Sequence, residues 1–305
     1  MKGKNYFLNG IFGTLKKREV YTAYFFIFPS VILITYFWIY PSIWTIIYSF
    51  TKWDGINPPV FIGLRNFREL LFDDPLALHS LLITIYYMVG TLPEAIFLSL
   101  IIALVLNKHW LKGRQFLTGT YFLPVAISMV GVCAIWMWLL DPMSGLVNWI
   151  MEFFRLPTQA WLQDERLALL SICIVSVWKW LGWFIVIYIA ALQAIPSMYC
   201  EAARIDGANR WQEFRYIIWP MLIPTTFFLL ITGMIGAFQV FDQVYMMTLG
   251  GPANSTKVMM YYIYDAGFGS MQRMGYSSAL ATVLLIILLV STIFQWRYYT
   301  GKLEV

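Results

Sequence analysis

Charged residues are scarce in this sequence. They make up 12% of its 305 residues, against roughly 25% in an average soluble domain. Hydrophobic residues make up 60% and aromatic residues 18%. So little charge does not suit a surface that faces water on all sides, and we expect most of the chain to face lipid or other apolar helices.

Residue types that carry catalysis or bind metals are also few. The sequence has two histidines, His79 and His109, and three cysteines, Cys133, Cys173 and Cys200. Neither type shows the spacing of a metal or redox motif such as H-E-x-x-H. The phosphate-binding loop G-x-x-x-x-G-K-[ST] is missing too, so ATP hydrolysis by that route is excluded. We therefore expect no catalytic residue, no metal and no cofactor held by this chain.

Long apolar runs dominate what is present. Each is long enough to cross the apolar core of a bilayer, which takes about 20 helical residues, and a helix satisfies its own backbone in lipid. The sequence thus predicts an all-α polytopic membrane protein with six transmembrane helices. The predicted spans lie near residues 22–49, 79–106, 116–140, 168–195, 218–247 and 277–299. They make one domain over 22–299, between cytosolic tails at 1–21 and 300–305.

The distribution of Lys and Arg predicts the orientation. With the N-terminus in the cytosol, the inner segments carry 13 of these residues and the outer loops carry 7. Because basic residues favour the cytosolic side, this bias predicts that both ends lie inside. The net charge of +5 sits in short loops beside the spans, so it is assigned to membrane orientation and not to nucleic acid.

The charged stretch between the fourth and fifth spans, 196–218 with the proline that follows it, contains a spaced motif. Its elements are Glu201, Ala202, Ala203, Arg204, Asp206, Gly207, Ile217 and Pro220. The order Glu-Ala-Ala, three residues, Gly, nine residues, Ile and then Pro resembles the cytoplasmic coupling loop of permease subunits in binding-protein-dependent ABC importers. An ordinary amphipathic surface loop would explain the charge but not this joint spacing.

Local signals predict two short helices in this loop. Ser197 is placed to cap a helix that runs to Ile205, and Gly207 supplies a left-handed stop. Asn209 and Gln212 have the spacing of a capping box for the next helix. Where the family usually has Leu-Pro, this sequence has Trp219 before the proline.

The resemblance extends over about residues 20 to 300. Segments 63–67 (GLRNF), 121–124 (YFLP), 190–196 (AALQAIP) and 249–252 (LGGP) are similar to the carbohydrate-uptake branch of these permeases. That resemblance implies a type I importer fold, no enzyme activity, and residence in the cytoplasmic membrane of a prokaryote. It also implies three protein partners: a second, homologous permease subunit, an ABC ATPase dimer that holds ATP–Mg on the cytosolic side, and an extracytoplasmic sugar-binding protein.

Polar groups inside predicted spans are candidates for the path of the solute. An ionisable residue there is costly and marks a path or a paired contact. On the fifth span the spacing predicts one shared face for Gln239, Asp242 and Gln243, beside aromatic rings that suit a sugar. The candidate residues are Gln239, Asp242, Gln243, Phe238, Tyr245 and, on the second span, Glu94. The alternative for each is a packing contact to a neighbouring helix, and Lys179 is expected to extend its ammonium toward the membrane interface.

Two other functions compete with sugar import. One is an ABC permease for a glycerol-phosphate-type solute, which the motifs do not separate from a sugar permease. The other is an ion-driven secondary transporter, for which Glu94 and Asp242 are the best support. An intramembrane enzyme would need clustered carboxylates or basic groups, and those in this sequence are isolated.

Overall fold

The computed structural model describes residues 17–108, 111–269 and 271–303. Most of this part is helical, and its one sheet is a short antiparallel hairpin of β1 (Thr51–Lys52) and β2 (Val60–Phe61), in which Thr51 pairs with Phe61. Residues 1–16 of the predicted tail, His109, and residues 304–305 lie outside the described residues.

Within the described residues, five helical stretches are long and apolar enough to cross a membrane, and a bent pair of helices makes a sixth if it is counted as one span. The five are Glu19–Tyr48, Pro75–Leu106, Ala168–Ala194, Arg210–Phe238 and Met274–Tyr299. The predicted third span, 116–140, is instead two helices, α7 (Arg114–Ala126) and α8 (Met129–Leu139), which meet at 98°.

The remaining elements connect or subdivide these stretches. The first stretch comprises α2 (Lys17–Ile34), the π-helical turn η1 (Thr35–Ile39) and α3 (Tyr40–Tyr48), and the second comprises α5 (Pro75–Val89) and α6 (Leu92–Leu106). Before α5 come α4 (Arg65–Arg68) and η2 (Glu69–Asp73), and α9 (Leu146–Phe153) lies between α8 and α10 (Ala168–Ala194). The chain continues through α11 (Ser197–Ile205), α12 (Arg210–Glu213), η3 (Phe214–Ile218), α13 (Trp219–Phe238), α14 (Asp242–Met247), α15 (Met259–Phe268) and α16 (Met274–Leu303).

Helix α10 lies at the centre of the described core. It packs against α6 and α7 and also meets α13, and its Ile185 and Tyr188 are fully buried. At Gly182 a Cβ atom would lie 2.1 Å from the carbonyl oxygen of Tyr121. The glycine therefore lets α10 and α7 approach with their backbones almost in contact, as small residues do between membrane helices.

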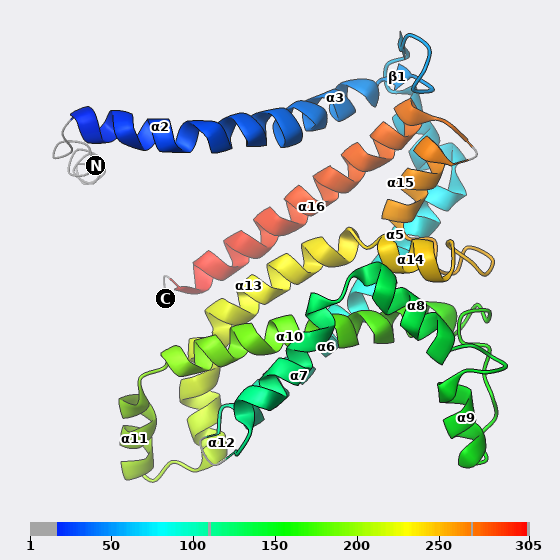
Figure 1. Cartoon of the computed structure of the whole chain (residues 1–305). Coiled ribbons are helices and arrows are strands. Elements are labelled where there is room, and N and C mark those ends of the chain that lie inside the picture. Colours follow the sequence, from blue (N-terminus) through cyan, green and yellow to red (C-terminus); the bar gives the residue numbers. More distant parts are fainter. Residues whose placement is uncertain (1–16, 109–110, 270, 304–305) are drawn as a thin grey trace.

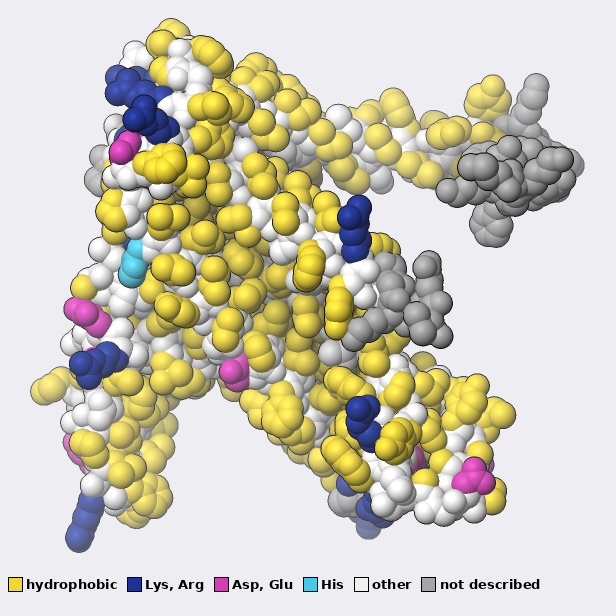
Figure 2. Space-filling model, turned by 180° about the vertical axis from the view of Figure 1, so that it is seen from behind, with side chains coloured by type: hydrophobic (Ala, Val, Ile, Leu, Met, Phe, Trp, Pro, Cys, Tyr) yellow, Lys and Arg dark blue, Asp and Glu magenta, His cyan; other side chains and the backbone are white. Residues whose placement is uncertain are grey.

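The first helical stretch stands apart from this core. In its apolar window, within Glu19–Tyr48, no residue is buried, and Figure 1 shows it as an arm joined to the rest near the end of α3. Figure 2 shows a surface of mostly hydrophobic side chains on which charged ones are sparse. Such a surface suits lipid or another apolar helix and not water.

The ends of the molecule sort onto two sides. In Figure 1 the start of α2, the end of α16, and the helices α11 and α12 lie toward the left, whereas the β1–β2 hairpin and α9 lie toward the right. Both ends of the described chain are therefore on the same side as the loop of α11 and α12. The side that faces the cytosol remains the expectation from the Lys and Arg count.

Candidate functional site

The segment between α10 and α13 is a helix, a turn and a helix, as its local signals predict. Gly207 has φ +84° between α11 and α12. The Asn209 side chain accepts from the Gln212 backbone N–H at 2.9 Å, and the Gln212 side chain accepts from the Asn209 N–H at 2.8 Å. The capping box is thus confirmed. The predicted cap at Ser197 is wrong, because Pro196 takes the extended N-cap position and Ser197 is already the first helical residue.

An ion pair that the sequence reading missed joins the two short helices. Arg204 on α11 donates to both carboxylate oxygens of Glu213 on α12, at 3.1 and 2.8 Å. The Glu213 side chain is 9% exposed and that of Arg204 is 62% exposed. These hydrogen bonds raise the pKa of Arg204. A bidentate pair between guanidinium and carboxylate has a fixed geometry, so it sets the angle between α11 and α12.

The motif residues of α11 lie on an uncovered surface. Glu201, Ala202 and Asp206 are exposed, and Ile205 is 86% exposed. The helix after the turn is different, because α12, η3 and α13 form one continuous stretch from Arg210 to Phe238. Ile217 lies in η3 and Pro220 is the second residue of α13. A force applied to the loop would therefore reach the membrane helix directly.

A cavity of about 610 Å³ lies where two helical stretches are interrupted. One interruption separates α5 from α6 at Gly90 and Thr91, and the other separates α13 from α14 at residues 239–241. Helix α10 contributes a third wall with Lys179, Trp180 and Trp183. The cavity is lined by Tyr87, Thr91, Leu92, Ala95, Met129, Ser176, Val177, Lys179, Trp180, Trp183, Phe184, Thr232, Gly233, Gly236, Ala237, Gln239, Val240, Phe241, Asp242 and Gln243.

The cavity brings together part of the predicted path. Gln239, Asp242 and Gln243 line it, but they do not share one helical face as predicted, because Gln239 ends α13 and Asp242 begins α14. The side chain of Gln243 is buried and donates to the Ser176 hydroxyl at 3.4 Å. Asp242 and Gln239 are exposed.

The other three path candidates lie outside the described lining of the cavity. Phe238 is buried in the core around α10, Tyr245 stacks on Phe241 with ring centroids 5.2 Å apart, and Glu94 is exposed in the first turn of α6. The lining also includes Trp180 and Trp183, which are not among the candidates from the sequence. Position along α10 alone does not tell which neighbours a tryptophan meets.

Lys179 differs from its prediction most clearly. Its side chain is buried and does not extend toward the interface. The ammonium donates to the carbonyl oxygens of Pro124 at 2.6 Å, Val125 at 3.0 Å and Ile127 at 2.6 Å. These carbonyls lie at the C-terminal end of α7, where a helix lacks internal donors and carries partial negative charge. The break between α7 and α8 thus provides the partner that the cation needs.

Residues 77–300 match a protein family that is described as binding-protein-dependent transport system inner membrane component. The chain belongs to this permease family. Its members are membrane components of transport systems, so this permease is a multi-pass membrane protein and a transport subunit, not an enzyme.

Similar proteins cover nearly the whole permease. It is 35% identical over 286 residues to the probable ABC transporter permease protein YurN of Bacillus subtilis, covering 92% of this chain and 97% of that one. It is 31% identical over 304 residues to AmyD of Thermoanaerobacterium thermosulfurigenes, the probable permease protein of a starch degradation products transport system, covering 100% and 99%.

Solved structures show the same fold. A chain of a bacterial alginate ABC transporter, in complex with an alginate pentasaccharide-bound periplasmic protein, superposes with a TM-score of 0.80. The two chains are 23% identical, and the match covers 91% of this chain and 93% of that one. The fold is therefore that of a type I ABC importer permease, as the sequence predicts.

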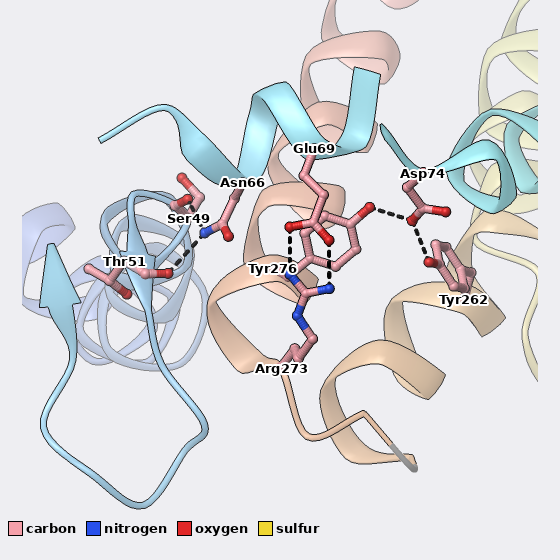
Figure 3. Close-up of polar contacts among 8 residues, drawn as sticks. All are labelled: Ser49, Thr51, Asn66, Glu69, Asp74, Tyr262, Arg273 and Tyr276. Carbon is pink, nitrogen blue, oxygen red and sulfur yellow. Dashed lines mark hydrogen bonds and ion pairs between the residues drawn. The ribbon is translucent and has the colours of Figure 1, made fainter. Parts of the chain in front are cut away.

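The hairpin polar cluster begins beside the β1–β2 hairpin, on the opposite side of the molecule from α11 (Figure 1). It comprises Ser49, Thr51, Asn66, Glu69, Asp74, Tyr262, Arg273 and Tyr276 (Figure 3). Asn66, in the G-L-x-N-F segment, is buried and donates to the carbonyl oxygens of Ser49 and Thr51, each at 2.9 Å. The preceding Gly63 has φ +62°, which favours glycine. Through Asn66, the G-L-x-N-F segment thus holds the backbone that follows α3.

Two acidic residues, Glu69 and Asp74, extend the hairpin polar cluster to α15 and to the start of α16. Glu69 accepts two hydrogen bonds from Arg273, at 2.7 and 2.6 Å. Asp74 accepts from the hydroxyls of Tyr262 and Tyr276, each at 2.5 Å, and burial raises the pKa of Tyr262. Figure 3 shows these side chains converging from three separate segments.

Proposed function

We propose that this permease carries a sugar through the cytoplasmic membrane as one half of an ATP-driven importer. The observation that supports it most is the continuity of α12, η3 and α13 from the exposed loop to the cavity. A separate ATPase dimer, which holds ATP–Mg, would contact Glu201, Ala202, Ala203 and the rest of the coupling motif. Closure of that dimer would move α11 and α12, and with them the wall of the cavity.

The cavity suits a polyhydroxyl solute. Asp242 offers carboxylate acceptors, and the Gln239 amide offers both a donor and an acceptor. The rings of Trp180, Trp183 and Phe241 border the same space and can stack on the C–H faces of a sugar. Relatives are named for starch degradation products, lactose and sn-glycerol 3-phosphate, which supports a solute from the carbohydrate range.

Two protein partners complete the transporter in this proposal. A second, homologous permease subunit would cover apolar surface that the chain leaves open, including the arm, which has no buried residue in its window. An extracytoplasmic sugar-binding protein would deliver the solute at the side of the hairpin polar cluster. This arrangement requires both chain ends and α11 to lie in the cytosol.

An ion-driven carrier, the competing function, is less well supported by the structure than by the sequence. It needed Glu94 and Asp242 as coupled acids along a path, but Glu94 lies outside the described cavity lining. The family is also defined by dependence on a binding protein. The glycerol-phosphate alternative rests on relatives such as UgpA of Agrobacterium fabrum, 31% identical over 245 residues.

Coupling can be tested in the assembled transporter in lipid. ATP hydrolysis is measured with and without sugar-loaded binding protein, for the unaltered chain and for Glu201→Ala combined with Gly207→Pro. Proline cannot adopt the φ of +84° at Gly207, so the variant deforms the loop. Glu165→Ala, which removes an exposed carboxylate on the other side, is the matched control.

We expect stimulation by the loaded binding protein in the unaltered transporter and in the control, and its loss in the loop variant while the complex stays assembled. If the loop variant leaves the stimulation of ATP hydrolysis unchanged, the loop does not couple the ATPase to the membrane helices. If sugar uptake proceeds without the ATPase, the importer proposal fails and an ion-driven carrier takes its place.

A further inference from the structure

The charges around the cavity point to the class of solute that it admits, an inference that rests on the proposed function. Of the described residues that line the cavity, two carry a formal charge, Lys179 and Asp242. They differ in what their charged groups contact. That difference determines which of the two can act on a solute.

Lys179 is already fully engaged. An ammonium group has three N–H donors, and three backbone carbonyl oxygens accept from Lys179 within 3.0 Å. Its positive charge also faces the negative end of the α7 dipole. The side chain is 6% exposed, so the cation belongs to the wall of the cavity and has no donor left for a phosphate or carboxylate of a solute.

Asp242 is in the opposite situation. It begins α14 with an exposed side chain, and among the described residues no hydrogen bond or ion pair engages its carboxylate. The neutral side chains nearest to it along the chain are Gln239 and Gln243, of which Gln243 already donates to Ser176. Of the two charged groups in the described lining, the Asp242 carboxylate is therefore the one that remains available to hydrogen-bond with a solute.

We infer that Asp242 makes this cavity selective for neutral polyhydroxyl solutes and against anionic ones such as phosphate esters and uronates. A neutral sugar can donate its hydroxyls to the carboxylate. An anionic solute meets like charge at Asp242, and Lys179 has no N–H donor left to bind it. This assigns Asp242 a role in charge selection and Lys179 a role in shaping the wall.

Charged thiol reagents of similar size can test the field inside the cavity. The assembled transporter in nanodiscs carries Gln239→Cys, and its reaction rates with 2-sulfonatoethyl, 2-hydroxyethyl and 2-trimethylammonioethyl methanethiosulfonate are measured. Each rate is divided by that of the same reagent with 2-mercaptoethanol, which removes the intrinsic reactivity. The unaltered chain serves as the blank. It corrects for the native cysteines, of which Cys133 and Cys173 are buried and Cys200 is partly exposed.

We expect the anionic reagent to react roughly fivefold more slowly than the neutral one after this correction, as one nearby charge of like sign would cause. Adding Asp242→Asn should bring the two rates together. Equal corrected rates in Gln239→Cys, no change on adding Asp242→Asn, or no reaction with any of the reagents would each overturn the inference.

The same preparations distinguish this inference from the proposed function. ATP hydrolysis stimulated by the loaded binding protein is measured alongside the thiol rates. If stimulation is intact and the charge selectivity is missing, only the inference fails. If stimulation is absent, coupling fails whatever the thiol rates show.

Discussion

At the scale of single residues, buried charges in this permease are matched to specific partners. Lys179 binds three carbonyls at the end of α7, and the nearly buried Glu213 binds Arg204 with both oxygens. Leaving such a group without its partner costs more than the pair contributes, because the buried charge or carbonyl stays desolvated.

Replacing Lys179 should therefore destabilise the bend between α7 and α8. Lys179→Met keeps a long apolar chain but leaves the carbonyls of Pro124, Val125 and Ile127 without their donor, which should cost about 3 kcal/mol. We expect a Tm several degrees lower for the purified complex. Lys257→Met, at a lysine that pairs with Asp265, is the control and should change Tm much less. An unchanged Tm for Lys179→Met would show that the ammonium does not hold the bend.

Breaking the pair of Arg204 and Glu213 should weaken coupling more than assembly. Arg204→Ala and Glu213→Gln each remove the bidentate contact between α11 and α12, so the stimulation of ATP hydrolysis by the loaded binding protein should fall in both. The exchange Arg204→Glu with Glu213→Arg should recover part of it, because the contact can form in reverse. Equal stimulation in all four proteins would mean that the angle between the helices is set by other contacts.

At the scale of elements, the interruptions of the helices matter as much as the helices. The cavity lies beside the gap between α5 and α6 and the gap between α13 and α14. In contrast, α12, η3 and α13 run without interruption. The permease thus combines a continuous helical stretch toward the loop with interrupted helices around the cavity, where backbone can be irregular because it is covered by protein or lines the cavity.

The close approach of α10 to α7 gives a test with an internal control. Gly182→Ala places a Cβ atom 2.1 Å from the Tyr121 carbonyl oxygen, so the helices must separate and the Tm of the complex should fall by several degrees. Gly119→Ala, on α7 with nothing within 4 Å, should leave Tm unchanged or raise it slightly, since alanine favours helix by about 1 kcal/mol. Similar behaviour of the two variants would contradict the packing described for α10.

Local features were predictable from the sequence, and distant contacts were not. The capping box of Asn209 and Gln212 and the left-handed Gly207 depend on neighbours within a few residues, and both are confirmed. The break after Phe238 was missed because Gln239, Val240 and Phe241 include neither Pro nor Gly. The partners of Lys179 lie 52 to 55 residues away, a separation that hydropathy does not encode.

At the scale of the whole molecule, the chain has distinct features at its two sides and a first helical stretch that packs little against the rest. The loop of α11 lies at one side and the β1–β2 hairpin at the other (Figure 1), with the cavity lined by α10, α13 and other helices of the core. The apolar arm has no buried residue in its window. Both features suit half of an assembly in which a second permease covers the arm and an ATPase contacts the loop.

Removing the Asn66 side chain from the hairpin polar cluster should loosen the arm and leave the loop intact. Asn66→Ala leaves the carbonyls of Ser49 and Thr51 without their donor, so proteolysis near the β1–β2 hairpin should become several-fold faster. Asn57→Ala is the control, because Asn57 is exposed and donates only to the neighbouring Asp54. Equal cleavage rates in the two variants would show that Asn66 does not anchor the arm.

The most direct test of the account is whether the loop moves the cavity. In the assembled transporter, the reaction rate of Gln239→Cys with the neutral methanethiosulfonate reagent is measured without nucleotide and with ADP trapped by vanadate after ATP hydrolysis, with and without Gly207→Pro. The account predicts a nucleotide-dependent change in rate that disappears when Gly207 is replaced. A change of the same size in the Gly207→Pro transporter would contradict the claim that α11 and α12 transmit the motion.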